Sequence, residues 1–593
     1  MRDFGAKGDG KHDDTAAILA AIAAEGGNTG PSFWQTKIVY LPAGTYLISR
    51  PLLKRYADGR FGSGMTLIGQ SRNDTTIRLV DRAPGFGNSA APRGVIMTTS
   101  KLLDGTPTSG GKDYIHKGEG NDAYENFVEH LTIDVGHGNP GAIGIDYLAN
   151  NIGEIRDVGV VAPAGSGAIG ISMQRKWPGP ALLNNVEVRG FDTGIAVANT
   201  EYGMTLNDVR LIGQHRIGLA DDSNAVSAAH LTIESAPIAI ANAAPNGLVT
   251  LTDSVLRRGA NGQRAFLNRG AIAAFDLQLD GLDATASPLT GVLLRDQWHG
   301  HRLQPAPSLP DAPDIPDQPI AQWMNVQHEM EPADPPHDIT NAMRRAMASG
   351  AATIYLPYGR YTIKDAIHIP PTLRQIVSMN ASIAVSPDRD PRFGRTTGMF
   401  VIDQPGPPLL IDRVVFDMTN LGDQLAVELA AHRDITLRDI VTAGTSLLDR
   451  KPNGGRVFIQ DTCCGTMHLA GPEPVYAMQL DTEGGGTRIV NDGSPLTILG
   501  LKTEGDCTVL DNRDGARTDV LGGLLYVVHH ADPAVPAFRN VDASLHAAFL
   551  EESFRPDSRY TFYLHGREGD DVPASDFPDR GYGRIVPWLV AGH

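Results

Sequence analysis

Hydrophobic residues in the first half of the chain recur as short i, i+2 pairs, and successive pairs are 22 to 28 residues apart. Alternation with period 2 is typical of a β-strand with one buried face. A strand that returns once per turn of chain, with loops of variable length between, indicates a parallel β-helix. A β-sandwich would show turn signals about every 8 to 12 residues instead. The pairs are Leu131/Ile133, Val158/Val160, Val186/Val188, Val209/Leu211 and Leu231/Ile233.

An internal duplication extends this pattern to the second half of the chain. The segment Ile38–Ile48 returns 315 residues later as Thr353–Ile363. Each copy follows an apolar run that predicts a short helix, and we expect Asp14 and Asp338, with the threonines next to them, to cap these helices. Further strands are predicted at 414–416, 435–437, 457–459, 476–480 and 496–501. The predicted fold is therefore all-β, with two tandem parallel β-helix (solenoid) domains.

The boundary between the domains is predicted from proline. Six prolines lie between residues 302 and 322, and proline fits neither a helix interior nor a central strand. We therefore predict an N-terminal β-helix over 1–305, a proline-rich linker over 306–322 and a C-terminal β-helix over 323–593.

Composition and charge narrow the class of partner. The chain has 593 residues, 66 glycines, 40 prolines and only 6% aromatic residues, and its formal net charge is −17. That charge disfavours nucleic acid, anionic membranes and polyanionic glycans, so we expect a neutral substrate. We also expect a monomer. The three cysteines, Cys463, Cys464 and Cys507, predict no disulfide framework and are interpreted as buried thiols. No metal or cofactor site is predicted, because the histidines lack zinc-type spacing.

The pattern Leu-x-Thr-Glu occurs twice, ending at Glu483 and at Glu504, 21 residues apart. One turn of a solenoid takes about 20 to 25 residues, so the two carboxylates are predicted to stack on neighbouring strands about 4.8 Å apart. Strand parity directs both outward. Such a pair fits the two-acid chemistry of glycoside cleavage. The spacing alone favours the alternative interpretation, a polar column that only decorates the solenoid surface.

The N-terminal motifs resemble those of the pectate-lyase superfamily of right-handed parallel β-helices. They are Asp3–Gly10, Asp13–Ile18 and Tyr40–Tyr46. The superfamily contains hydrolases, lyases, epimerase-like proteins and phage tailspikes, so the resemblance implies the fold and leaves the reaction open.

A narrower resemblance lies in the second half. The segments Phe458–Gly465, Tyr476–Glu483, Leu499–Glu504 and Thr518–Gly523 are similar to glycoside hydrolase family 55. This resemblance implies an exo-acting, inverting β-1,3-glucanase with two β-helices packed side by side and a substrate pocket between them. It assigns Glu504 as general acid and Glu483 as the glutamate that helps to hold the attacking water. It also implies secretion, although no signal peptide precedes the first motif and a cytoplasmic location stays open.

Substrate-binding candidates come from the same motifs and from acidic turns of the first half. Tyr476 and Gln479 stand where the family has Trp-Ala-Arg-Gln, so the sugar subsite is expected to differ. Lys502 is predicted to pair with Asp481 across the strands. The further candidates are His468, Glu201, Asp222, Ser223 and Ser227, and turn capping is the alternative role for the acids of the first half.

Two other functions remain open from the sequence. One is a polysaccharide lyase or polygalacturonase-like enzyme acting on an acidic glycan, which the net charge of −17 opposes. The other is a tailspike-like protein that binds glycans without catalysis and needs only the fold.

Overall fold

The computed structural model divides the chain into two compact units. The first comprises Met1–Ala306 with Gly522–Leu524, and the second comprises Pro307–Leu521 with Leu525–His593. The structure describes residues 1–592 except 25–37, 56–60, 101–119, 200, 260–263, 283–288, 296, 301–308, 390–392, 394–396, 418–423, 445, 529–531, 554, 556, 568–569 and 582. The predicted boundary at 305 and the first linker residues, 306–308, lie outside the described residues, and the domain limits stay a proposal.

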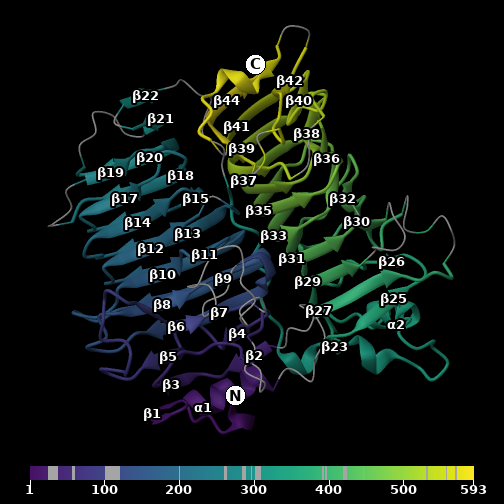
Figure 1. Cartoon of the computed structure of the whole chain (residues 1–593). Helices are drawn as coiled ribbons and strands as arrows, with labels where there is room; N and C mark the ends of the chain where they lie inside the picture. The colour runs from purple at the N-terminus through teal and green to yellow at the C-terminus, as the bar shows by residue number, and fades with distance from the viewer. Residues whose placement is uncertain are drawn as a thin grey trace. The chain divides into compact units, whose positions relative to one another are not determined.

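In the first unit, the described strands form two sheets whose members follow one another coil by coil (Figure 1). The larger sheet contains β1 (Asp9–Asp13), β2 (Ile38–Leu41), β3 (Gly44–Ile48), β4 (Thr66–Gly69), β5 (Thr75–Leu79), β7 (Tyr124–Asp134), β9 (Asn150–Val161), β11 (Ala181–Arg189), β13 (Met204–Ile212), β15 (Ala225–Ala229), β16 (Thr232–Glu234), β18 (Leu248–Arg257), β20 (Ala271–Asp280), β21 (Leu289–Leu294) and β22 (Gln297–Gly300). The smaller contains β6 (Arg93–Met97), β8 (Ala142–Asp146), β10 (Ile169–Met173), β12 (Thr193–Ala198), β14 (Ile217–Asp222), β17 (Ile238–Asn242) and β19 (Arg264–Asn268).

The described strands of the second unit also form two sheets. One contains β23 (Met324–Asn325), β24 (Thr353–Leu356), β25 (Arg360–Ile363), β27 (Gln375–Val385), β29 (Leu409–Asp417), β31 (Ile435–Ala443), β33 (Val457–Cys463), β35 (Val475–Glu483), β37 (Pro495–Glu504), β39 (Arg517–Tyr526), β41 (Ser544–Glu552) and β44 (Gly583–Ala591). The other contains β26 (Ile367–His368), β28 (Phe400–Ile402), β30 (Leu425–Leu429), β32 (Ser446–Arg450), β34 (Thr466–Ala470), β36 (Gly486–Asp492), β38 (Cys507–Arg513), β40 (Phe538–Val541), β42 (Phe562–His565) and β43 (Val572–Pro573).

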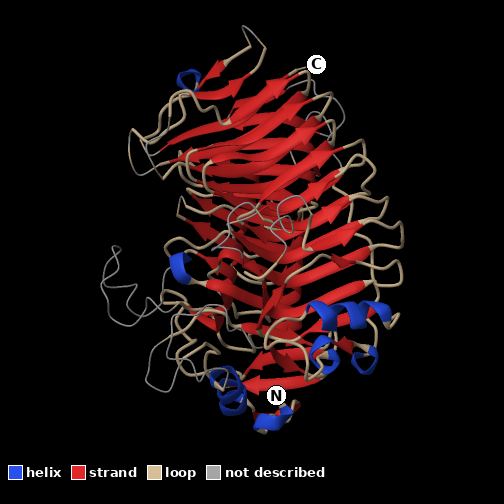
Figure 2. Cartoon of the chain, turned by 90° about the vertical axis from the view of Figure 1, so that its right-hand side faces the viewer, coloured by secondary structure: helices blue, strands red, loops and turns tan. Residues whose placement is uncertain are grey.

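Helices are short and few among the described residues, as Figure 2 shows. They are α1 (Thr15–Ala23), α2 (Thr340–Ala348) and the 3-10 turns Arg2–Phe4, Gly120–Asp122, Ile320–Gln322, Val326–Glu329 and Ala574–Asp576. No helix in the described part of the chain combines the length and apolar character that a bilayer crossing requires. The predicted all-β, parallel β-helix architecture is confirmed; the side-by-side packing of the two domains stays a prediction.

The predicted apolar pairs form the core by stacking in register. Val158 pairs with Val186, which pairs with Val209 on the following coil, and all three are buried. Parallel pairing places identical positions of successive coils above one another, so each ladder excludes water along the unit. Burial of each such side chain contributes about 1.5 to 3 kcal/mol.

The internal duplication extends to individual hydrogen bonds. Tyr46 donates its hydroxyl hydrogen to the Pro42 carbonyl at 2.9 Å, and Tyr361 does the same to Pro357 at 3.0 Å. The predicted helix caps are only partly correct. Asp14 is the N-cap residue of α1, but its side chain accepts from Lys7 N and Gly8 N rather than from the helix. The N-cap of α2 is the residue after Asp338.

The proline-rich segment is tied to the second unit where the structure describes it. The amide of Gln375, on β27, donates to the carbonyl oxygen of Ile315 at 3.2 Å and to the carboxylate of Asp317 at 3.3 Å. Trp323 donates its indole N–H to the Gln318 carbonyl at 2.9 Å. Residues 315 and 317 of this segment are therefore hydrogen-bonded to the first residue of β27.

Left-handed residues, missed from the sequence, bend the long strands at the same position in successive coils. The side chains in this column are mostly Asn, Asp or His in the first unit, which tolerate positive φ better than other L-residues. The column comprises His130, Asp157, Asn185, Asp208, His230, Asp253 and Asp276 in the first unit, and Asn380, Arg413, Asp439, Asp461, Gln479, Gly500 and Gly522 in the second part of the chain.

Asp208 tests the cost of this bend, because its φ is 49° and its side chain is exposed. Glycine adopts this conformation freely, whereas a β-branched residue does not. Asp208→Val should melt about 2 to 4 °C below Asp208→Gly, which corresponds to about 1 kcal/mol in a unit of this size. Differential scanning calorimetry measures the difference. Equal melting temperatures would show that the bend carries no strain.

Candidate active site

The two Leu-x-Thr-Glu segments lie on neighbouring parallel strands in the predicted register. Glu483 at the end of β35 pairs with Glu504 at the end of β37, and Asp481 pairs with Lys502. All four side chains leave the same face, because they are separated by two residues along each strand. The stacking of the two glutamates that the 21-residue repeat predicts is therefore present.

Lys502 joins the carboxylates into one cluster. Its Nζ lies 3.3 Å from Asp481 Oδ2 and 3.0 Å from Glu504 Oε2, and it also contacts Glu483 Oε1. The lysine side chain is only 1% exposed, whereas those of Glu483 and Glu504 are 24% and 32% exposed. Within the cluster, the two glutamates are thus the groups that a ligand can reach.

Asp481 is the buried carboxyl of the cluster. Burial raises the pKa of its carboxyl well above the usual range, and the neighbouring Glu483 and Glu504 add to the rise, while Lys502 opposes it. A fully desolvated carboxylate is costly unless it is paired. Proximity to one lysine therefore keeps three carboxyl groups together that would otherwise repel one another.

Glycines and an arginine shape the turn beyond the glutamates. Gly484 and Gly505 follow them with φ of 113° and 128°. A Cβ built on Gly505 would lie 2.7 Å from the Gly484 carbonyl oxygen, so the coils stack here only without side chains. Arg488 donates to Thr482 Oγ1 at 3.1 Å and to the Cys464 carbonyl at 2.9 Å, which fixes the turn against the preceding coil.

Cys463 and Cys464 lie beside Asp481 and Glu483 and are joined by a disulfide. Ligand atoms of these four residues lie within 4.8 Å of one another. The set does not fit a metal ion, because the disulfide leaves no thiolate and the ammonium of Lys502 already pairs with both carboxylates. The interpretation of Cys463 and Cys464 as thiols is wrong, because they form a disulfide. The sequence did not predict it, because two adjacent cysteines have no spacing that indicates a pairing. Cys507 is a buried free thiol, as predicted.

Two predicted substrate contacts on β35 lie away from the glutamates. Tyr476 is at the opposite end of the strand and stacks on Phe458, with ring centroids 5.4 Å apart. Gln479 occupies the left-handed bend with φ of 51° and is buried. The roles of Tyr476 and Gln479 in sugar binding stay predictions. The alternation of inward and outward side chains did not indicate the bend at Gln479.

His468 lies in the other sheet of the second unit, on β34. Its Nδ1 is 3.0 Å from Asp449 and its Nε2 is 2.9 Å from Asp492. The hydrogen bond to Asp449 is the main cause that raises the pKa of His468, and the bond to Asp492 adds to it. The imidazole therefore bridges one acid on the preceding coil and one on the following coil. The alternation of apolar residues alone did not show which sheet His468 would join.

The predicted candidates of the first unit lie on the consecutive strands β14 and β15, in the turn between them and in the segment just before β13. Glu201 and Ser227 are buried, and Ser227 lies on β15 in register with Thr205 and Thr250. Asp222 ends β14, and Ser223 follows it with φ of 79°. The carboxylate of the adjacent Asp221 accepts a hydrogen bond from the backbone N–H of Asn224 at 3.0 Å. This contact caps the turn, which is the alternative role considered for the acids of this region. Substrate contacts by these residues stay predictions.

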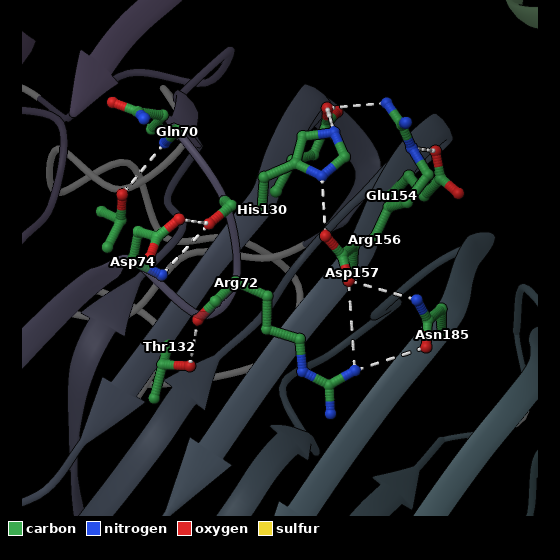
Figure 3. Close-up of polar contacts among 12 residues, drawn as sticks. Gln70, Arg72, Asp74, His130, Thr132, Glu154, Arg156, Asp157 and Asn185 are labelled. Atoms are coloured by element: carbon green, nitrogen blue, oxygen red, sulfur yellow. Dashed lines mark hydrogen bonds and ion pairs between the residues drawn. The ribbon is translucent and has the colours of Figure 1, made fainter. Parts of the chain in front are cut away.

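A polar network on the large sheet of the first unit had no counterpart in the sequence interpretation. His130 Nδ1 lies 2.9 Å from Asp157 Oδ2, and Arg72 donates to Asn185 Oδ1 at 3.3 Å. Figure 3 draws both contacts. Arg156 donates to Glu154 at 3.0 Å. His130, Asp157 and Asn185 belong to the left-handed column, so a search for Asn, Asp and His at the coil period would have found them.

Known families resemble this chain in part. Residues 1–263 match the family model described as rhamnogalacturonase A/epimerase, pectate lyase-like. A glucan 1,3-beta-glucosidase of Cochliobolus carbonum is 33% identical over 127 residues, which are 18% of this chain and 16% of that protein. Alginate lyase 7 of Azotobacter vinelandii is 43% identical over 86 residues, which are 14% and 9% of the two chains. The matched segments are thus small parts of these relatives.

Among solved structures, a variant of sacteLam55A from Streptomyces sp. SirexAA-E in complex with glucose aligns over 97% of this chain and 96% of its own, with 11% identity and a TM-score of 0.48. The resemblance drawn from the sequence motifs is confirmed, by the family model and the glucosidase relative, for pectate-lyase-like β-helices and for glucan 1,3-β-glucosidases.

The ion pairs of His468 contribute to the stability of the second unit in a way that depends on pH. Because the pKa of His468 is raised above 6.5 in the folded chain, the contribution is fully present below about pH 6.5 and is lost as pH rises through the folded pKa. The melting temperature of the wild type should exceed that of His468→Gln most at pH 5.5 to 6.5, and the gap should narrow toward pH 9. A gap that does not vary over this range would contradict the assigned ion pairs.

Proposed function

We propose that this chain is a glycoside hydrolase that acts on a neutral glucan with β-1,3 linkages. The observation that carries the proposal is the pair Glu483 and Glu504, stacked on adjacent strands, partly exposed and joined through one buried lysine. The resemblance to glucan 1,3-β-glucosidases supports the reaction class. The formal net charge of −17 supports a neutral substrate, because a polyanionic chain would be repelled.

The proposed roles follow from the family 55 resemblance. Glu504, which is 32% exposed, acts as general acid that gives its proton to the glycosidic oxygen. Glu483 accepts a hydrogen bond from the attacking water and orients it. After bond cleavage the leaving sugar carries the proton of Glu504. The water supplies the new hydroxyl group at the anomeric carbon, and its other proton passes to Glu483.

Stereochemistry is the sharpest question that the geometry raises. Inverting enzymes hold their carboxyl groups about 6.5 to 9.5 Å apart, and retaining enzymes about 5 to 5.5 Å apart. Glu483 and Glu504 contact the same ammonium group, so their nearest oxygens are closer than the inverting range. We propose inversion, as the family 55 resemblance implies, with the water bound beside the two glutamates and not between them. Exo-action, a closed pocket, secretion and a monomeric state belong to the same proposal.

A uronan lyase or epimerase is the second candidate. Alginate lyase 7 resembles a segment of the chain, and the family model that matches residues 1–263 is described as rhamnogalacturonase A/epimerase. β-Elimination leaves an unsaturated uronate that absorbs ultraviolet light, whereas hydrolysis leaves only a new reducing end. Product formation from alginate or polygalacturonate, with none from laminarin, would favour this candidate over the glucanase.

Conservative substitution separates the roles of the two glutamates. Glu504→Gln keeps the shape and removes the transferable proton, so kcat on laminarin should fall by about 10²- to 10⁴-fold. An aryl β-glucoside with a good leaving group should restore more activity to Glu504→Gln than to Glu483→Gln, because its departure needs no proton. Glu473→Gln, a glutamate of the same unit outside the cluster, is the matched control. Near-normal turnover by Glu504→Gln on laminarin would overturn the assignment.

The anomer released first reports the mechanism. Inversion of a β-1,3 linkage should produce α-anomeric sugar before mutarotation, as ¹H NMR of the anomeric region during the first minutes would show. Initial β-anomer would mean retention, and Glu483 would then be a nucleophile, which its short approach to Glu504 allows.

A further inference from the structure

The charge of the candidate site does not balance with the two glutamates alone. Lys502 contacts three carboxylates, those of Asp481, Glu483 and Glu504. Two of these four groups, Asp481 and Lys502, are buried. Ions removed from water keep their charge only when partners replace the lost hydration, and removal of one partner leaves the others uncompensated.

A second cation lies at the edge of the cluster. Arg488 lies on β36, just after the turn that follows Glu483, and its guanidinium is held by Thr482 Oγ1 and by the carbonyls of Cys464 and Gly485. Burial lowers the pKa of Arg488, and the nearby Asp481 and Glu483 act in the opposite direction. Lys502 and Arg488 thus both act on Asp481 and Glu483, and with two cations and three carboxyls one proton makes the group neutral. A hydrolase of this type needs one protonated acid.

We infer that Lys502 is a positioning residue for the proposed hydrolysis: its ammonium holds the carboxyl groups of Glu483 and Glu504 in place and balances their charge without contacting the sugar. The inference rests on the proposed function. Its geometric basis is the side-chain burial of Lys502, 1% exposed, between two glutamates that are 24% and 32% exposed. A ligand that reaches the glutamates therefore meets carboxylates and not the ammonium.

The strands packed around Lys502 supply further groups that affect a pH profile. Asp481 and Glu483 come from β35, Glu504 from β37 itself and Arg488 from β36. Next to Arg488, Cys507 on β38 is a buried thiol whose pKa burial raises. On the following coils, backbone hydrogen bonds from Gly505 to Tyr526 and from Val527 to Glu552 place Tyr526 and Glu552 in the column of Glu504.

The test compares Lys502→Met, which removes the charge, with Lys502→Arg, which keeps it. In Lys502→Met, kcat on laminarin should fall about 10- to 100-fold, the size expected for misplaced catalytic groups, and KM should change little. The acidic limb of the kcat profile should move to higher pH, because loss of a positive charge favours the protonated carboxyls. Lys502→Arg should keep the position of that limb and recover part of kcat.

Lys364→Met is the matched control. Lys364 lies 3.3 Å from the Asp338 carboxylate, the same distance as between Lys502 and Asp481, but it is 42% exposed and lies beside α2. It should leave kcat, KM and the pH profile unchanged. Raised KM with unchanged kcat in Lys502→Met would show that Lys502 binds sugar and would overturn the inference. Unchanged kcat with a lowered melting temperature would do so too, because the pair with Asp481 would be only structural.

A stability measurement separates this inference from the proposed function. If the wild type hydrolyses no glucan, the proposed function fails, and the charge role is still tested by melting. The melting temperature of Lys502→Met should lie below that of the wild type at pH 7. The deficit should shrink as pH falls, because burial raises the pKa of the Asp481 carboxyl that Lys502 contacts. A deficit that does not vary with pH would contradict charge balance. If Lys502→Met does not fold, the unchanged acidic limb of Lys502→Arg is the deciding result.

Discussion

The parallel backbone register between successive coils is the constraint on which the rest of the structure depends. It places Val158, Val186 and Val209 above one another in the core, and by the same rule it places Glu483 beside Glu504 on the outer face. A slip by one residue would exchange inside and outside, exposing the apolar ladder if it occurred in the first unit and burying both acids if it occurred in the second. Core packing and site geometry therefore depend on the same pairing rule.

Side-chain chemistry extends this backbone rule along both units. In the second unit the amide of Asn491 donates to Asn512, and that of Asn512 donates to Asn540, at 3.1 and 2.8 Å. The cluster around Lys502 is a charged version of such a column. Its carboxylates repel one another at the distance that parallel pairing imposes, about 4.8 Å, and a cation with three hydrogens is the smallest group that satisfies all of them.

The sequence contained enough information for the repeating part of this architecture. Period 2 fixed the inward face, the 315-residue duplication predicted a second solenoid, and the 21-residue spacing predicted adjacent glutamates. The sequence was less informative where side-chain contacts and local backbone conformation determine the structure. The pairing of Lys502 with Asp481 was predicted, but its contacts with both glutamates depend on side-chain length and burial. The left-handed bend at Gln479 and the disulfide at Cys463 and Cys464 follow from backbone geometry that alternation does not encode.

The central claim is that Glu504 and Glu483 act on a glucan while the buried ammonium of Lys502 positions their carboxyl groups and balances their charge. A crystal structure of the Glu504→Gln variant with a β-1,3-linked glucose trisaccharide tests it most directly. The account predicts a glycosidic oxygen within hydrogen-bonding distance of the side chain at position 504, a water on Glu483 and no sugar atom in contact with Lys502. A trisaccharide bound away from the ends of β35 and β37, or held by the ammonium of Lys502, would contradict it.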